Sequence, residues 1–181
     1  DGVRLKEVFD EAEIGWERNK LPMVVGRDTL GKPTVEDLAE MPHMLIAGAT
    51  GSGKSVCLNS ILITMLLTRT PDRVRMVLID PKQVELQIYS DIPHLLCPVV
   101  TDMKRAPFVL DWAVRQMDDR LRLFKMAGVR KVSEYNDLGV EGLRTALGEE
   151  FDAEEFPDFL PYFVIVIDEL ADLMLTARKE V

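Results

Sequence analysis

Short apolar runs alternate with longer amphipathic stretches along this chain of 181 residues. Three of the runs lie next to glycine or proline and are too short for helices, so they predict buried strands. These runs occupy 44–47, 74–79 and 162–167. We expect the three strands to lie in one mostly parallel sheet.

Two stretches between these runs have the spacing of amphipathic helices. The apolar positions of the first, 54–68, are Leu58, Ile61, Leu62, Met65 and Leu66. Those of the second, which begins after Thr101, are Ala106, Val109, Ala113, Met117, Leu121 and Phe124. Gly128 is typical of the residue that follows a last helical turn. The order strand, helix, strand over 44–79 predicts a parallel pair with a right-handed crossover.

The remaining segments predict less regular structure. Residues 1–20 mix charges with a few apolar positions and predict a lead-in helix or linker. Residues 21–33 combine an apolar run with glycine, aspartate and proline, which predicts a hairpin. Residues 139–160 are acidic and rich in turn residues, and we interpret them as a surface excursion. The main domain is therefore expected to extend from 21 to 181.

The composition is that of a globular domain, with 47% hydrophobic and 29% charged residues. No apolar stretch approaches the roughly 18 residues of a membrane-spanning helix, so we expect no membrane contact by this segment. The start lacks the layout of a signal peptide. Cys57 and Cys97 form neither a C-x-x-C pair nor part of a zinc-ligand pattern. We expect a cytoplasmic protein in a reducing environment.

The net charge of -9 argues against a protein that coats nucleic acid by electrostatics alone. The charge is unevenly distributed, however. Residues 102–133 hold eight Lys/Arg against four Asp/Glu, whereas residues 134–160 hold nine acids against one arginine. This distribution is compatible with a local basic contact and equally with two solvated surfaces.

A phosphate-binding loop is the clearest chemical signal in the sequence. Its residues fit G-x-x-x-x-G-K-[ST] at every specified position, between a predicted strand and a predicted helix. Glycines let backbone N–H groups surround a phosphate chain, and the following helix adds its positive dipole end. Lys54 can reach the β- and γ-phosphates, and the Ser55 hydroxyl can bind Mg²⁺. The predicted nucleotide-binding residues are Gly48, Ala49, Thr50, Gly51, Ser52, Gly53, Lys54, Ser55 and Val56.

Two carboxylates follow the most hydrophobic predicted strand, 162–167. In enzymes with this loop, an acid at such a strand end holds Mg²⁺, and a neighbouring glutamate polarises the attacking water. Asp168 is therefore the predicted metal residue and Glu169 the predicted catalytic residue, together with Lys54. A water-activating glutamate favours a hydrolase over a kinase. The chain also lacks an Asn-Lys-x-Asp guanine motif after either strand, so ATP is expected rather than GTP.

Further motifs resemble the FtsK/SpoIIIE family of DNA translocases, from about Leu21 to Met174. The matching segments are MPHMLIAG at 41–48, MVLIDPK at 76–82, IPHLL at 92–96, VTDM at 100–103, MAGVR at 126–130, YN at 135–136 and IDELADLM at 167–174. The resemblance implies a RecA-like, three-layer αβα P-loop ATPase that uses ATP and Mg²⁺. It also implies a hexameric ring that translocates double-stranded DNA during chromosome segregation and cell division. It assigns no role to Asp80-Pro81-Lys82.

The sequence departs from the family pattern after the second carboxylate. Family members continue with a sensor strand, an arginine that reaches the neighbouring subunit's nucleotide, and a DNA-reading winged helix. By this resemblance, the missing strand belongs between the phosphate-loop strand and the Asp168 strand. We therefore expect an incomplete sheet, part of a longer protein that is the cytosolic motor of a membrane-anchored chain.

Three alternatives remain. A related ring ATPase could drive conjugative DNA transfer or protein secretion. A small-molecule kinase would transfer phosphate to an added acceptor and would not need Glu169. A non-catalytic nucleotide-binding module would bind ATP without turnover.

Overall fold

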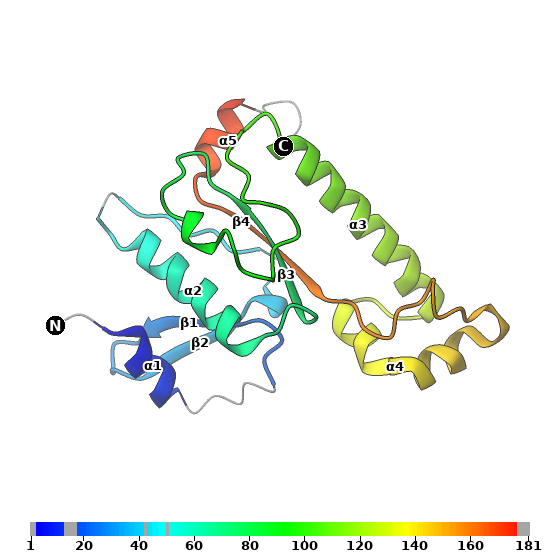
Figure 1. The fold of residues 1–181 in the computed structure, drawn as a ribbon. Coiled ribbons are helices and arrows are strands. Elements are labelled where there is room, and N and C mark those ends of the chain that lie inside the picture. The colour runs from blue at the N-terminus through cyan, green and yellow to red at the C-terminus, as the bar shows by residue number, and fades with distance from the viewer. Residues whose placement is uncertain (1–2, 13–17, 42, 50, 177–181) are drawn as a thin grey trace. The chain divides into compact units, whose positions relative to one another are not determined.

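The computed structural model describes residues 3–12, 18–41, 43–49 and 51–176. The chain divides into two compact units, Asp1–Thr70 and Pro71–Val181. The arrangement of elements is therefore given for each unit separately, and Figure 1 colours the chain by residue number. Within the described residues, no helix has both the length and the apolar character needed to cross a membrane.

The first unit contains an antiparallel hairpin. Its elements are α1 (Leu5–Glu11), β1 (Pro22–Arg27), β2 (Pro33–Asp37), a 3-10 turn η1 (Leu38–Glu40) and α2 (Lys54–Thr68). The register pairs Pro22 with Asp37 and Arg27 with Pro33. Asp28 holds the turn between the strands, because its carboxylate accepts the N–H groups of Leu30 and Lys32. The predicted hairpin is confirmed.

The predicted helix at 54–68 is also confirmed, and it packs against the hairpin. Its buried face includes Ile61, Leu62 and Met65. Two hydrogen bonds add to this packing: the Ser60 hydroxyl donates to the Val24 carbonyl at 2.7 Å, and the Val24 N–H donates to Thr64 Oγ1 at 3.4 Å. These contacts connect the helix that follows the phosphate loop to the hairpin that precedes it.

The strand predicted at 44–47 is not formed. Residues 43–49 have no regular secondary structure, and Leu45 is 78% exposed. A strand requires neighbouring backbone partners, and the hairpin strands of this unit pair with each other. The prediction of a strand at 44–47 was therefore wrong, as was the crossover unit that depended on it. An apolar run signals a preference for burial, but it does not supply the strand that would pair with it.

The second unit is built on a parallel pair of strands. Its elements are β3 (Val74–Ile79), a 3-10 turn η2 (Gln87–Tyr89), α3 (Ala106–Ala127), α4 (Val132–Leu147), a 3-10 turn η3 (Gly148–Glu150), β4 (Tyr162–Ile167) and α5 (Leu170–Thr176). The register runs from Val74 opposite Tyr162 to Ile79 opposite Ile167. Residues 94–100 add isolated parallel bridges to β3, through Leu95 and Val100. The predicted strands at 74–79 and 162–167 are confirmed.

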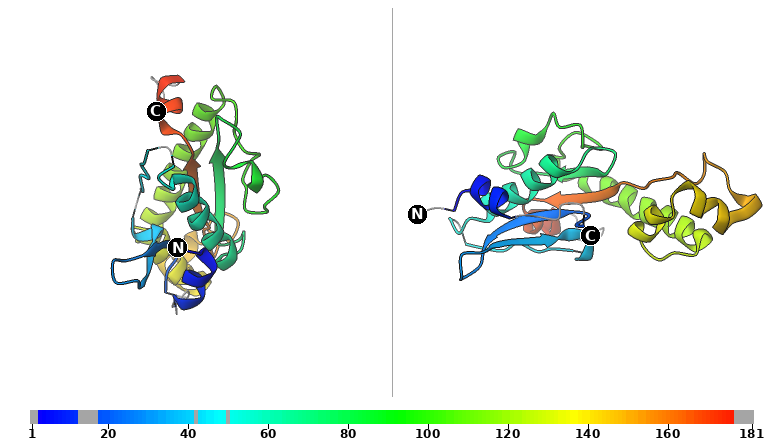
Figure 2. Two further views of the ribbon diagram at one scale, coloured as in Figure 1. Left: turned by 90° about the vertical axis from the view of Figure 1, so that its left-hand side faces the viewer. Right: turned by 90° about the horizontal axis from the view of Figure 1, so that it is seen from below.

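Helix α3 runs alongside this sheet, as Figures 1 and 2 show. The Trp112 ring stacks on Phe163 of β4 with the ring centroids 5.7 Å apart, and the Arg120 guanidinium lies 3.8 Å from the same ring's centroid. Burial lowers the pKa of Arg120 to about 10, so this arginine remains a cation at neutral pH. Gly128 ends the helix with φ 73°, as predicted.

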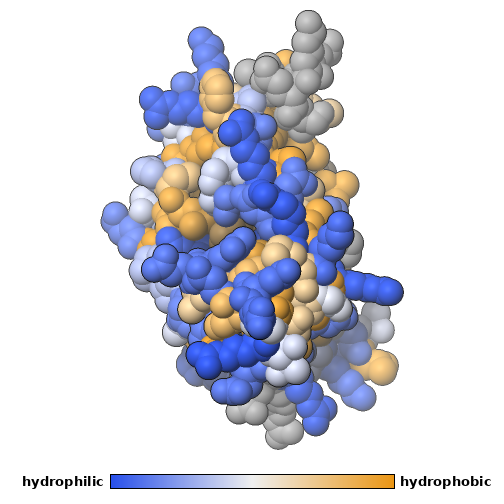
Figure 3. All heavy atoms as spheres, turned by 90° about the vertical axis from the view of Figure 1, so that its right-hand side faces the viewer, coloured by the Kyte–Doolittle hydropathy of each residue, from blue (hydrophilic) through white to orange (hydrophobic). Residues whose placement is uncertain are grey.

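The apolar stripe of α3 is only partly buried. Ala106 and Phe124 lie in the core near its two ends, but Met117 is 53% exposed and Leu121 is 50% exposed. Figure 3 looks onto the side that carries α3, where hydrophobic and hydrophilic side chains are interspersed. The periodicity therefore predicted the helix correctly, but it did not predict how much of the stripe is covered.

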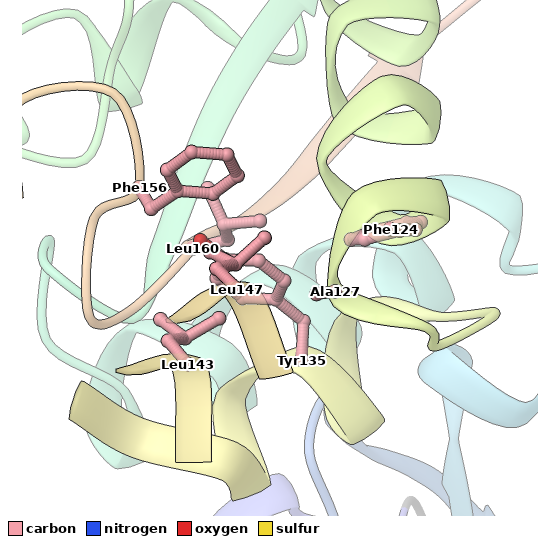
Figure 4. Packing of buried hydrophobic residues seen from close by; sticks show 7 residues of the cluster. All are labelled: Phe124, Ala127, Tyr135, Leu143, Leu147, Phe156 and Leu160. Atoms are coloured by element: carbon pink, nitrogen blue, oxygen red, sulfur yellow. The ribbon is translucent and has the colours of Figure 1, made fainter. Parts of the chain in front are cut away.

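The segment 139–160, interpreted as an acidic surface excursion rich in turns, contains more regular structure than that interpretation implied. Helix α4 continues to Leu147, with a kink at Gly139 where φ is 57°. Its side chains form a hydrophobic cluster with the end of α3 and the following loop (Figure 4). The buried members are Phe124, Ala127, Tyr135, Leu143, Leu147, Phe156 and Leu160. Glycines and acidic residues obscured the helical period in the sequence.

Candidate functional site

The phosphate loop has the backbone geometry that its glycines predict. Gly51 and Gly53 have φ values of 80° and 95°, in the left-handed region that disfavours other residues. Gly53 is the N-cap of α2. A Cβ on Gly48 would lie 2.1 Å from Ser52 Oγ, so the Ser52 side chain lies close to the Gly48 backbone. The Ser52 N–H also donates to the Ala49 carbonyl at 2.9 Å.

The loop leads directly into the first turn of α2. Lys54 and Ser55 begin this helix and are half-buried, whereas Val56 is 72% exposed. Gly53 has no side chain with which to cap the helix, and the positive dipole end of α2 lies at the loop. Together with the close approach at Gly48, this arrangement fits an anionic phosphate chain. Thr50 lies outside the described residues.

The two predicted carboxylates lie at the carboxyl end of β4. Asp168 is 9% exposed, and its N–H donates to the Ile79 carbonyl of β3 at 3.0 Å. The Glu169 side chain is 34% exposed and comes immediately before α5. One acid is therefore fixed against the sheet, while the next one reaches solvent. This arrangement suits a buried metal-binding acid beside an acid that contacts water.

Asp80 occupies the corresponding strand end of β3. The parallel register places it beside Asp168, one position beyond the pair of Ile79 and Ile167. Asp80 is fully buried, and its Oδ2 atom accepts the Leu86 N–H at 2.9 Å. Its Oδ1 atom is buried without a hydrogen-bond partner among the described residues. The sequence showed Asp80 after a strand, but the strand register was needed to place it beside Asp168.

Lys82 lies close to two acids, Glu169, which follows β4, and Asp172 of α5. Its Nζ atom is 3.5 Å from Glu169 Oε2 and 3.8 Å from Asp172 Oδ2. The negative charge of Asp172, followed by the hydrogen bond to Glu169, raises the pKa of Lys82 above its usual value. Lys82 therefore stays positively charged at neutral pH. Sequence reasoning assigned no role to this residue, although it follows a strand end as the acids do.

The structure groups the predicted residues into two sets. The loop residues and Lys54 belong to the first unit, and Asp168 and Glu169 belong to the second. The loop leads into α2 as its motif predicts, although the predicted strand before it is not formed, and the two acids follow β4 directly. A shared Mg²⁺ bound by Ser55 and Asp168 stays a prediction.

Comparison with known proteins gives consistent results. A profile of the FtsK/SpoIIIE family matches residues 4–181. "DNA translocase FtsK 1" of Neisseria meningitidis serogroup B is 48% identical over 99% of this chain and 23% of its own length. "DNA translocase FtsK" of Pseudomonas aeruginosa is 44% identical, again over 99% of this chain and 23% of its own length. The chain thus spans about a quarter of the length of these curated relatives.

Two solved structures share the fold. The pCW3 conjugation coupling protein TcpA, in a monomer form with ATPγS, has a TM-score of 0.63 and 30% identity, covering 91% of this chain and 42% of its own. The cytoplasmic domain of the Type VII secretion ATPase EccC of Thermomonospora curvata has a TM-score of 0.68 and 20% identity. The latter match covers 98% of this chain and 22% of that protein. These likenesses support the RecA-like P-loop fold class.

Proposed function

The chain belongs to the FtsK/SpoIIIE family, and on this premise we propose that it is the ATP-hydrolysing part of a motor that moves double-stranded DNA. Residues 21–181 form the motor domain in this proposal, and residues 1–20 lead into it. The observation that carries the proposal is the combination of a phosphate loop at the start of α2 with two carboxylates at the end of β4.

The phosphate loop binds the nucleotide. Gly48, Ala49 and residues 51–53 are exposed, so their backbone can surround the phosphate chain, and the positive end of α2 adds to the attraction for the same negative charge. Lys54 neutralises charge on the β- and γ-phosphates. Val56, on the exposed side of the first turn, completes the contact with the nucleotide.

The carboxylates serve hydrolysis. Ser55 and Asp168 would hold Mg²⁺, which neutralises phosphate charge when it is bound. Glu169 orients a water molecule and accepts its proton while the water oxygen bonds to the γ-phosphorus. The bond from that phosphorus to the β–γ bridging oxygen breaks, leaving ADP and inorganic phosphate. A dedicated base for water favours this reaction over transfer to another acceptor.

Double-stranded DNA is the proposed substrate of the motor. Both quoted curated relatives carry the name DNA translocase. A ring of subunits, hexameric by family resemblance, would grip DNA without reading its sequence, through local contacts to phosphates. Such contacts need positive charge only where the DNA passes, so a net charge of -9 is compatible with this role. A cytosolic location follows from the same proposal.

The test is ATP turnover by the full-length protein with two variants. Lys54→Ala should lower kcat by about 100-fold or more, because it removes a charge that stabilises the transferring phosphoryl group. Glu169→Gln should lower kcat by about 100-fold or more while ATP still binds, because the amide cannot accept the proton. Phosphate release measures turnover, and a fluorescent ATP analogue measures nucleotide binding, so loss of catalysis can be distinguished from loss of binding. Full turnover by Glu169→Gln would contradict the assignment.

The likeness to the conjugation coupling protein supports a second candidate, a motor for conjugative DNA transfer. Turnover assays with double-stranded and single-stranded DNA distinguish the two, since a chromosomal motor responds to the duplex. A preference for single strands would favour the second candidate.

A further inference from the structure

Lys82 connects two elements that follow different strands. It comes three residues after the end of β3, and its ammonium group reaches Glu169 after β4 and Asp172 in the first turn of α5. The exposed fractions of the Lys82 and Glu169 side chains are 57% and 34%. An ion pair this exposed adds little to stability, because solvent screens it. Its main effect is therefore on the orientation of the side chains.

The backbone around Lys82 is held in a specific turn. The Asp80 carboxylate accepts the Leu86 N–H at 2.9 Å, which closes the segment from 80 to 86. The Gln83 N–H donates to the Asp80 carbonyl at 3.3 Å. Gln83 has φ 57°, a left-handed conformation that is unfavourable for most residues other than glycine. Such strain persists where the surrounding structure fixes it, and it is enriched at functional sites.

This turn directs a positive charge toward the proposed catalytic carboxylate. Glutamate has a long side chain, and ordering it has an entropic cost. The Lys82 contact is made to one carboxylate oxygen, Oε2. This contact restricts the directions in which the carboxylate can point. Asp172 holds the lysine from its other side, so the ammonium group has a defined position between two acids.

We propose that Lys82 is a positioning residue for hydrolysis, which orients the Glu169 carboxylate toward the attacking water. The inference rests on the proposed role of Glu169. Lys82 touches neither nucleotide nor water in this role. It acts through the carboxylate, and it links the turn after β3 to the rate of the chemical step.

The experiment measures kcat and KM for ATP in full-length protein carrying Lys82→Met, which keeps the aliphatic chain and removes the charge. Loss of alignment should lower kcat by about tenfold, because orienting a catalytic group contributes to rate. The KM for ATP should stay within about twofold, because Lys82 has no proposed contact to nucleotide. Lys82→Arg, which keeps the charge, should recover most of the lost kcat.

A double variant separates positioning from a general effect on structure. In a Glu169→Gln background, Lys82→Met should have almost no further effect on kcat, because the group that it positions is gone. The temperature of unfolding should change little in Lys82→Met. An unchanged kcat, a rise in KM alone, or equal losses in both backgrounds would overturn the inference.

The wild type and Glu169→Gln distinguish failure of the inference from failure of the proposed function. If the wild type hydrolyses ATP, Glu169→Gln does not, and Lys82→Met matches the wild type, only the role of Lys82 is wrong. If the wild type lacks turnover, or Glu169→Gln keeps it, the proposed function fails and the inference fails with it.

Discussion

In the phosphate loop, the residue type that fits at a position depends on side-chain contacts as well as on backbone angles. Gly51 and Gly53 are required by their positive φ values. Gly48 has no such angle, and it is restricted by Ser52, whose Oγ and Cβ atoms would lie 2.1 and 3.1 Å from an added Cβ. The motif therefore specifies glycine at 48 for a steric reason that the structure identifies.

We expect Gly48→Ala to weaken ATP binding, because the new methyl group displaces Ser52 and distorts the loop. The expected loss is about tenfold in Kd, which corresponds to about 1.4 kcal/mol. A titration with a fluorescent ATP analogue measures it.

The matched control for this substitution removes the hydroxyl that the methyl group would meet. Ser52→Ala alone should bind ATP almost as well as the wild type, and Gly48→Ala combined with Ser52→Ala should recover most of the lost affinity. A double variant as weak as Gly48→Ala would show that the Ser52 contact is not the cause.

Among the elements, α4 holds the segment that precedes β4, although its acidic residues and glycines did not predict such contacts. Two hydrogen bonds join Asn136 to the backbone N–H and carbonyl of Leu160, at 2.8 and 3.0 Å. The Tyr135 hydroxyl donates to the Pro157 carbonyl at 3.0 Å. The Tyr-Asn pair of the family resemblance therefore connects α4 to the segment that leads into β4. These contacts hold the segment directly before β4, the strand that Asp168 follows.

We expect Leu143→Ala to lower the free energy of unfolding by about 2–5 kcal/mol, because it leaves a cavity in the cluster around α4. Leu143 is fully buried. Urea unfolding followed by circular dichroism measures the change.

Val140→Ala on the same helix is the matched control. Val140 is 38% exposed, so its truncation should change the free energy of unfolding by no more than about 0.5 kcal/mol. Equal effects of the two substitutions would contradict the packing described for α4.

At the scale of the whole molecule, each unit contains half of the chemistry. The first unit has the predicted phosphate-binding loop, and the second has the predicted acids, with Lys82 between Glu169 and Asp172. The proposed hydrolysis draws on residues of both units, so we expect substitutions at the predicted residues of either unit to lower ATP turnover.

We expect double-stranded DNA to stimulate ATP turnover by the full-length protein at low salt. Contacts to phosphates release counterions, so the DNA concentration needed for half-maximal stimulation should rise about tenfold or more between roughly 50 and 200 mM salt. Turnover without DNA, measured over the same salt range, is the control. No stimulation by duplex DNA at low salt would contradict the proposed function.

Much of this protein could be predicted from its sequence because the decisive signals are local. The period of apolar residues gave α2, β3 and β4 with the bounds that the structure has. The phosphate-loop motif predicted the turn into α2, because its glycines act on their own backbone. The family motifs identified the fold class. Each of these depends on neighbours in the chain, which a sequence displays directly.

Only the tertiary structure decided which residues meet across the chain. The run at 44–47 is apolar enough for a strand, yet strand formation depends on a partner that its own residues do not provide. Helix α4 packs against α3 and the 148–160 loop, and these contacts bury apolar residues in a segment whose acidic and glycine residues indicated a surface excursion. Lys82 and Glu169 are far apart in sequence and meet because β3 and β4 pair in parallel register. Packing and pairing between distant segments are non-local, so they become visible only when the chain is folded.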